Sequence, residues 1–178
     1  MKTPAAAFIS TVLILLLGAC SSDNAYMTDK AGRKYKTIKI GDKIWMAENL
    51  NYETSTGSWC YNNNRELCEN YGRLYTWETA IAVCPEGWHL PDNDEWAALI
   101  EYLKTNSNNA FNPVLGGFRF YDGQFNNIDV TGMWWSSSKL PQNEEVYRCV
   151  YFMNASTSGQ DFVSGWFGAS VRYVKDCN

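Results

Sequence analysis

Residues 34–52 read KYKTIKIGDKIWMAENLNY, and the order of residue types in this stretch predicts how the domain begins. Apolar and polar side chains alternate on both sides of Gly41-Asp42, a dipeptide typical of two-residue hairpin turns. We therefore expect a β-hairpin over residues 34–47. The polar, turn-rich residues 49–69 that follow are expected to form a loop.

Two helices are expected after this loop. Apolar residues recur at helical spacing from Leu74 to Cys84, and Pro85 ends the run. A second helix is expected to begin at Asp92, which can cap it, while Glu95 can return the capping bond. Farther along, glycine-containing dipeptides separate short runs rich in Tyr, Phe, Val and Trp, as in strands and hairpins. This order predicts an α+β domain with two helices in its first half and a strand-rich second half.

Composition narrows the classes of function. The 178 residues are 46% hydrophobic and 19% charged, which suits one globular domain with a tail rather than a disordered chain. The formal net charge of −4 argues against nucleic acid as a partner, because phosphate contacts need clustered Lys and Arg. His89 is the single histidine, so most histidine-based metal centres are excluded. We expect no catalytic residues, no cofactor and no metal.

Residues 1–20 have the pattern of an export signal. Lys2 supplies the positive start, residues 8–17 are apolar, and the sequence LGAC at 17–20 ends the segment with small residues. The segment is too short for a stable membrane span. Its ending resembles the lipobox of bacterial lipoproteins, which implies that Cys20 becomes a lipid-bearing N-terminus. An ordinary secretory cleavage site before a cysteine is the alternative.

The expected organisation follows from this signal. We predict a lipoprotein signal peptide over residues 1–19, a lipidated N-terminus with a flexible tether over 20–33, and one domain over 34–178. Ser21 directly after the cysteine resembles signals that do not retain lipoproteins in the inner membrane. The expected location is therefore the cell envelope, at the outer membrane, with the membrane as a partner through the N-terminal lipid.

The other five cysteines are consistent with an oxidising compartment. Cys60 and Cys68 flank a short polar loop and are expected to bridge it. Cys84 needs a distant partner, either Cys149 or Cys177. Buried free thiols are one alternative, and a zinc site is another, although the chain contains no C-x-x-C pair.

Several segments together resemble the Fibrobacter succinogenes major paralogous domain, a family of bacterial envelope proteins. They are residues 40–52 (IGDKIWMAENLNY), 71–77 (YGRLYTW), 84–91 (CPEGWHLP), 132–138 (GMWWSSS) and 170–176 (SVRYVKD). The resemblance spans about residues 34–176. It implies a disulfide-supported α+β domain with two helices and a twisted antiparallel sheet. This fold is similar to that of C-type lectins and to its formylglycine-generating-enzyme branch.

The resemblance also bears on the second disulfide. The family usually has a cysteine where this sequence has Tyr173, and that cysteine is expected to bridge to the position of Cys84. Here Cys177 lies four residues later. We favour Cys84–Cys177, which ties the two ends of the domain together, with Cys149 as the alternative partner.

The candidate chemical sites have simpler structural explanations. His89 lies between the expected helices, where it can tie down a turn, and residues 136–138 are serines without the context of a nucleophile elbow. Possible calcium ligands do not have EF-hand spacing. They are Asp122, Asn126, Asn127 and Asp129. Asn143 and Glu144 only faintly match the calcium-binding loop of C-type lectins.

The aromatic residues are the most informative candidates for function. Four tryptophans are expected in the core: Trp45, Trp77, Trp88 and Trp96. Six other aromatic residues lie in loops or expected strands, where partly exposed rings can stack on sugars, although core packing is their alternative. These ligand-binding candidates are Trp59, Tyr61, Tyr121, Trp134, Tyr151 and Trp166.

These observations favour a non-catalytic envelope module that binds an extracellular ligand, either a glycan or another envelope protein. A structural or adhesive surface protein without a small-molecule site is the alternative. An enzyme of the formylglycine-generating type is a third possibility, and it requires a redox-active cysteine or a bound metal in a cleft.

Overall fold

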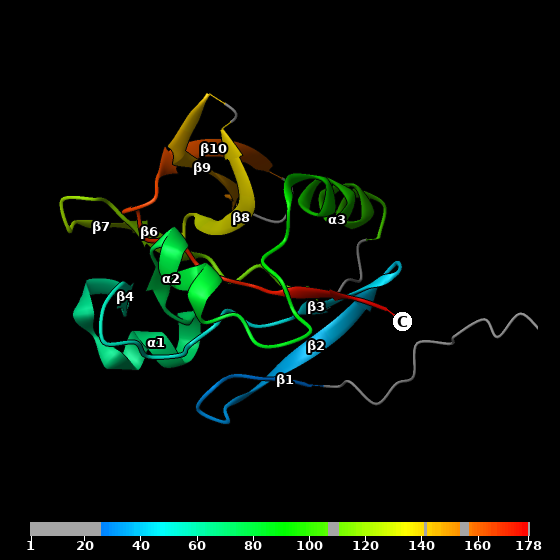
Figure 1. Ribbon diagram of the computed structural model, residues 1–178, viewed down its shortest axis with the longest axis horizontal. Coiled ribbons are helices and arrows are strands. Elements are labelled where there is room, and N and C mark those ends of the chain that lie inside the picture. The colour runs from blue at the N-terminus through cyan, green and yellow to red at the C-terminus, as the bar shows by residue number, and fades with distance from the viewer. Residues whose placement is uncertain (1–25, 107–110, 141, 154–156, 178) are drawn as a thin grey trace, which may run out of the picture.

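The computed structural model describes residues 26–106, 111–140, 142–153 and 157–177 (Figure 1). The expected signal peptide over residues 1–19 and the expected lipidation site at Cys20 lie outside these ranges. Within them, no helix is both long and apolar enough to cross a membrane.

Two sheets and a short two-stranded ribbon make up most of the domain. The first sheet has the order β1 (Tyr26–Thr28), β2 (Lys34–Ile40), β3 (Lys43–Met46) and β11 (Val174–Asp176). The second has the order β10 (Ser158–Ser164), β9 (Asn143–Phe152), β8 (Gly132–Leu140), β6 (Gly116–Arg119) and β7 (Phe125–Ile128). The ribbon joins β4 (Ser58–Trp59) to β5 (Leu74–Tyr75). Adjacent strands are antiparallel except β6 and β8, which are parallel.

The helices begin where side chains can cap their free N–H groups. They are α1 (Arg65–Tyr71), which follows the 3₁₀ turn η1 (Tyr61–Asn63), α2 (Trp77–Ala82) and α3 (Asn93–Thr105). Asn64 caps α1 and Thr76 caps α2. Asp92 and Glu95 form a reciprocal capping box at the start of α3, which confirms the expected helix start.

The expected α+β fold is wrong. The described chain is mostly β-structure, its three α-helices are short, and its strands come from both halves of the sequence. α1 begins inside residues 49–69, where a loop was expected. Leu74 pairs with Trp59 in the β4–β5 ribbon, so its burial belongs to a strand and α2 starts only at Trp77. This arrangement does not identify the domain as C-type-lectin-like.

The N-terminal strands correct the expected tether. β2 and β3 confirm the hairpin over residues 34–47, with Gly41 in the turn at φ +63°. β1 then adds to the edge of β2, where Met27 pairs with Tyr35. The buried Asp29 accepts a hydrogen bond from the Tyr35 hydroxyl at 2.7 Å. Residues 26–33 therefore belong to the folded domain rather than to a flexible linker.

The cysteines partly confirm the expected pairing. Cys60 and Cys68 form the predicted disulfide, which links the residue before η1 to α1. Both predicted partners of Cys84 are wrong, because Cys84 and Cys149 are free thiols. The Cys84 sulfur lies 3.2 Å from the Trp88 carbonyl in the turn after α2, whereas Cys149 is fully buried on β9. Burial raises the pKa of the Cys84 thiol to about 12.

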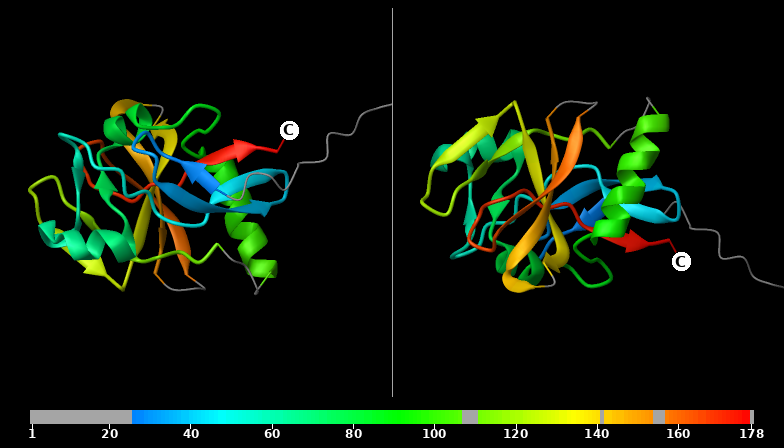
Figure 2. Two further views of the ribbon diagram at one scale, coloured as in Figure 1. Left: turned by 90° about the horizontal axis from the view of Figure 1, so that it is seen from below. Right: turned by 90° about the horizontal axis from the view of Figure 1, so that it is seen from above.

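Residues 167–174 connect the sheets through the middle of the domain, as Figures 1 and 2 show. Every residue of this segment is buried. Isolated backbone bridges join Ala169 to Tyr75 of β5, Gly168 to Arg119 of β6, Ser170 to Trp134 of β8, and Val174 to His89 before α3. The segment therefore sets the relative register of elements that are far apart in sequence.

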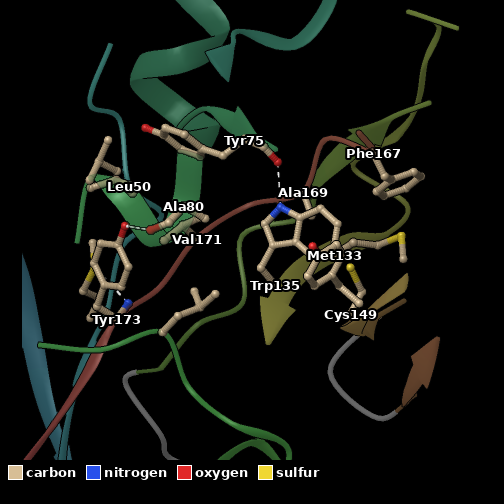
Figure 3. Packing of buried hydrophobic residues seen from close by; sticks show 14 of the residues in the cluster. Leu50, Tyr75, Ala80, Met133, Trp135, Cys149, Phe167, Ala169, Val171 and Tyr173 are labelled. Carbon is tan, nitrogen blue, oxygen red and sulfur yellow. Dashed lines mark hydrogen bonds between the residues drawn. The ribbon is translucent and has the colours of Figure 1, made fainter. Parts of the chain in front are cut away.

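The first core cluster forms around this segment (Figure 3). The Tyr173 hydroxyl donates to the Ala80 carbonyl at 2.6 Å. On the other side, the Trp135 indole N–H donates to the Tyr75 carbonyl at 2.6 Å. Polar atoms of the large buried side chains are thus satisfied by backbone groups of the ribbon and α2.

A buried arginine completes the segment. The Arg172 Nε donates to Asn49 Oδ1 at 2.9 Å, and its Nη atoms donate to the carbonyls of Phe111 and Asn112. The Trp134 indole N–H donates to the same Asn49 oxygen at 2.9 Å. Burial lowers the pKa of Arg172 to about 9, so the guanidinium is charged at neutral pH.

Arg172→Met is expected to destabilise the domain by about 3 kcal/mol or more, because it removes the donors to Asn49 Oδ1 and to the carbonyls of Phe111 and Asn112. The control is Arg65→Met, since Arg65 is exposed and its ion pair with Glu53 spans 3.3 Å. That change is expected to cost about 0.5 kcal/mol or less. Urea unfolding of both variants measures the difference, and equal stability of Arg172→Met and the parent protein contradicts the prediction.

Candidate functional site

Three of the six aromatic candidates line one cleft. Trp59, Tyr121 and Trp166 surround a volume of about 760 Å³, which is within the range of small-molecule sites. The remaining lining residues are Thr56, Gly57, Thr76, Glu78, Thr79, Arg119 and Ser164. The lining as a whole comes from β4 and the residues just before it, the start of α2, the end of β6 and the turn after it, and the end of β10 and the turn after it. Figures 1 and 2 place α3 at the end of the molecule away from β7.

Tyr121 and Trp166 lie at the tips of two tight turns. The Gly123 N–H donates to the Phe120 carbonyl at 3.0 Å, which closes the turn around Tyr121. The Phe167 N–H donates to the Ser164 carbonyl at 2.9 Å, which closes the turn around Trp166. The two side chains are 76% and 72% exposed. Large apolar side chains this exposed and neighbouring one cleft are typical of an interaction site.

An aromatic cluster joins these two turns. The Phe120 ring lies 5.9 Å from the Phe167 ring in an edge-to-face arrangement, and both rings contact Phe118 at 5.2 Å between centroids. Phe120 precedes Tyr121, and Phe167 follows Trp166. The packed rings therefore hold the two exposed residues at a defined separation.

Arg119 supplies the positive charge of the cleft. Its guanidinium lies 4.1 Å from the centroid of the Trp59 ring, a cation–π contact. Nη1 donates to the Phe120 carbonyl at 3.3 Å. Within the described residues, Arg119 has no carboxylate within ion-pair distance. Trp59 therefore holds Arg119, and Arg119 retains hydrogen-bonding capacity for a ligand.

The position of Arg119 depends on a close backbone approach. Arg119 and Gly168 exchange two backbone hydrogen bonds, at 2.8 and 2.9 Å. A Cβ atom on residue 168 would lie 2.8 Å from the Arg119 Cβ, so glycine is required at this point. The buried central segment thus places Arg119 beside the turn that carries Trp166.

The floor of the cleft is polar. The Thr76 hydroxyl caps α2 and donates to the Thr79 hydroxyl at 2.8 Å. Gly57 has φ +74°, and a Cβ there would lie 2.1 Å from the Thr79 hydroxyl oxygen. Glu78, in the first turn of α2, is exposed on the same lining. Aromatic rings, hydroxyls and both signs of charge therefore surround one volume.

The other three aromatic candidates lie elsewhere, and two of them are wrong as binding residues. Tyr61 is buried in η1 against Phe125, at 5.4 Å between ring centroids. Trp134 is fully buried because both faces of β8 are covered, and it packs edge-to-face on Phe152. Tyr151 is half-buried on β9, where its ring covers Gly159.

The polar candidates also have local partners. The His89 ring lies 2.8 Å from Glu95, and its backbone pairs with Val174. Ser136 is buried and accepts from the Ser138 N–H at 3.1 Å, while the Ser138 hydroxyl accepts from the Asn93 N–H at 3.0 Å. These contacts agree with the expected structural roles of the histidine and the serines.

The acidic segments have turn-forming contacts. Asp122 accepts from the Gln124 N–H and Asn143 accepts from the Glu145 N–H, each at 3.0 Å. Asp129 accepts from the Tyr71 hydroxyl at 2.7 Å. Within the described part of the chain, no group of three His, Cys, Asp or Glu side chains is placed to hold a metal ion.

Sequence reasoning missed Arg119, Glu78 and the threonine pair. No local pattern marks Arg119, because its importance comes from Gly168, which is about fifty residues away. The capping threonine offered a weak signal, since Thr76 directly precedes an apolar helical run.

Residues 38–110 match the Fibrobacter succinogenes major domain. Over this segment, which is 73 of the 178 residues, the chain is similar to that family. No curated protein and no solved structure matches it. The matched segment contains Trp59, Thr76 and Glu78 of the cleft, whereas Arg119 and Trp166 lie beyond it.

Removal of the Cys60–Cys68 disulfide is expected to cost about 2–3 kcal/mol of stability, because it frees a short loop in the unfolded chain. The double variant Cys60→Ser/Cys68→Ser tests this by urea unfolding. Each single variant should lose about as much stability as the double variant, since either substitution alone removes the disulfide. Unchanged unfolding midpoints contradict the prediction. So does a loss of stability in the double variant that equals the sum of the losses in the two single variants.

Proposed function

We propose that this protein is a non-catalytic binding module that holds a glycan in the cleft between Tyr121 and Trp166. The observation that carries the proposal is the pair of exposed aromatic side chains, each on a hydrogen-bonded turn, on the lining of one cleft. Exposing such rings to water is unfavourable unless a ligand covers them. Sugar rings have apolar C–H faces that suit flat aromatic surfaces.

The polar lining supports the same ligand class. Sugar hydroxyls both donate and accept hydrogen bonds, so they need donors and acceptors around the ring. Arg119 offers N–H donors, Glu78 offers carboxylate acceptors, and the Thr76–Thr79 pair and Ser164 offer hydroxyls. Trp59 has the guanidinium of Arg119 over its ring, so Tyr121 and Trp166 are the stacking residues of this proposal.

The proposal places the module in the cell envelope. The export signal over residues 1–19 and the lipobox-like LGAC sequence support a lipid on Cys20 and attachment to the outer membrane. A glycan-binding domain there meets polysaccharides outside the cell or in the periplasm.

Trp166→Ala and Tyr121→Ala are each expected to weaken glycan binding about tenfold or more, because each removes a stacking surface worth about 1 kcal/mol or more. The purified protein is first tested on an array of neutral, amino and acidic glycans, and titration calorimetry then measures the variants. Their thermal unfolding should match that of the parent, since both residues are exposed.

The control is Tyr102→Ala, which removes an exposed aromatic side chain on α3, outside the cleft lining. Binding by this variant should be unchanged. The proposal is contradicted if the folded protein binds no glycan, or if Trp166→Ala and the parent bind with equal affinity. A protein partner would then be tested instead.

Cys20→Ser is expected to abolish lipid attachment, because serine lacks the thiol that accepts the acyl-bearing group. Cells that express the parent protein should incorporate labelled fatty acid into it and retain it in the membrane fraction. The variant should do neither. Equal membrane retention and labelling of the two proteins contradicts the lipoprotein assignment.

A further inference from the structure

A second hollow adjoins the cleft, and Trp166 lines both. Its volume is about 230 Å³, and its lining adds Glu145, Tyr147 and Gly165 to residues of the cleft. The two volumes share Thr76, Glu78, Ser164 and Trp166. The cleft and the hollow are therefore neighbouring parts of one groove that passes Trp166.

The hollow has a closed floor. The Tyr147 ring stacks on Trp77 at 4.1 Å between centroids, with 22° between the ring planes. A Cβ atom on residue 165 would lie 2.7 Å from the Tyr147 ring, so glycine lets the backbone rest against this ring. The Trp77 N–H donates to the Gly165 carbonyl at 3.1 Å, which ties α2 to the Trp166 turn.

The chemistry of the hollow differs from that of the cleft. Glu78 and Glu145 are both exposed on its lining, and neither has an ion pair within the described residues. Carboxylates accept two or more hydrogen bonds each, so this end of the groove suits a ligand with several hydroxyl donors. Arg119 lines only the other end.

We infer that the site binds an oligosaccharide of at least two sugar units, with Trp166 at their junction. The first unit occupies the cleft of Tyr121 and Arg119, and the second places its hydroxyls against Glu78 and Glu145. The hollow is smaller than an ordinary small-molecule pocket, so it serves as an extension of the cleft. This inference rests on the proposed glycan function.

The test is the dependence of affinity on chain length. The full chain is titrated with β-1,4-linked oligomers of glucose and of N-acetylglucosamine and with α-1,4-linked oligomers of galacturonic acid, each series running from the monomer to four units. For the sugar that binds, the dimer is expected to bind about tenfold or more tightly than the monomer. Glu145→Ala is expected to remove most of this gain and to leave monomer binding unchanged.

Glu86→Ala is the matched control, because it removes one exposed carboxylate between α2 and α3, outside the groove lining. It should preserve the dependence on length. Equal affinity for monomer and dimer, together with a loss of both in Trp166→Ala, overturns the second subsite and leaves the glycan function standing. No binding to any oligomer or array glycan overturns both.

Discussion

Arg172 brings a positive charge into the centre of the domain, where it meets the side chain of Asn49. No carboxylate neutralises that charge at ion-pair distance within the described chain. Amide and carbonyl oxygens accept from its N–H groups instead, and the rings of Phe111 and Trp134 lie against it at 4.4 and 5.8 Å. Asn49 completes the arrangement by donating to the Tyr71 carbonyl at 2.9 Å. A buried charge is tolerated only when such bonds are all made, so segments far apart in sequence must come together at once.

The residues that precede Arg172 link this buried charge to the cleft. When Arg172 makes its buried hydrogen bonds, residues 167–171 before it form backbone hydrogen bonds with neighbouring strands in one register. Gly168 then pairs with Arg119, and Ala169 pairs with Tyr75, beside the Thr76 cap of α2. The Trp166 turn emerges directly before this path. The stability of the core and the geometry of the surface cleft therefore have a common cause, although the cleft residues themselves are exposed.

Local chemistry predicted local structure well. The Gly41-Asp42 turn, the capping box at Asp92 and the short disulfide at Cys60 depend on residues within ten positions of one another, and all three formed as expected. The fold class depended on long-range pairing, which periodicity does not report. Trp134 and Trp166 illustrate the limit. Both follow a glycine by one or two positions in a strand-rich region, yet one is buried between two packed faces of β8 and the other lies on a turn. Only the tertiary arrangement separates them.

The exposed rings of Tyr121 and Trp166 are held more rigidly than their exposure suggests. Tyr121 and Trp166 extend from turns closed by backbone hydrogen bonds, and the packed rings of Phe118, Phe120 and Phe167 join the two turns. Ordering flexible side chains and loops is a large part of the cost of binding. Here the folding of the core already orders the turns, because Phe167 belongs to the buried segment that Arg172 anchors. Ligand binding therefore requires less additional ordering. A preorganised pair of aromatic rings can hold a weakly apolar ligand such as a sugar, for which each stacking contact contributes only about 1 kcal/mol. In the oligosaccharide site that we propose, each added sugar unit meets a surface whose shape is set before the ligand arrives.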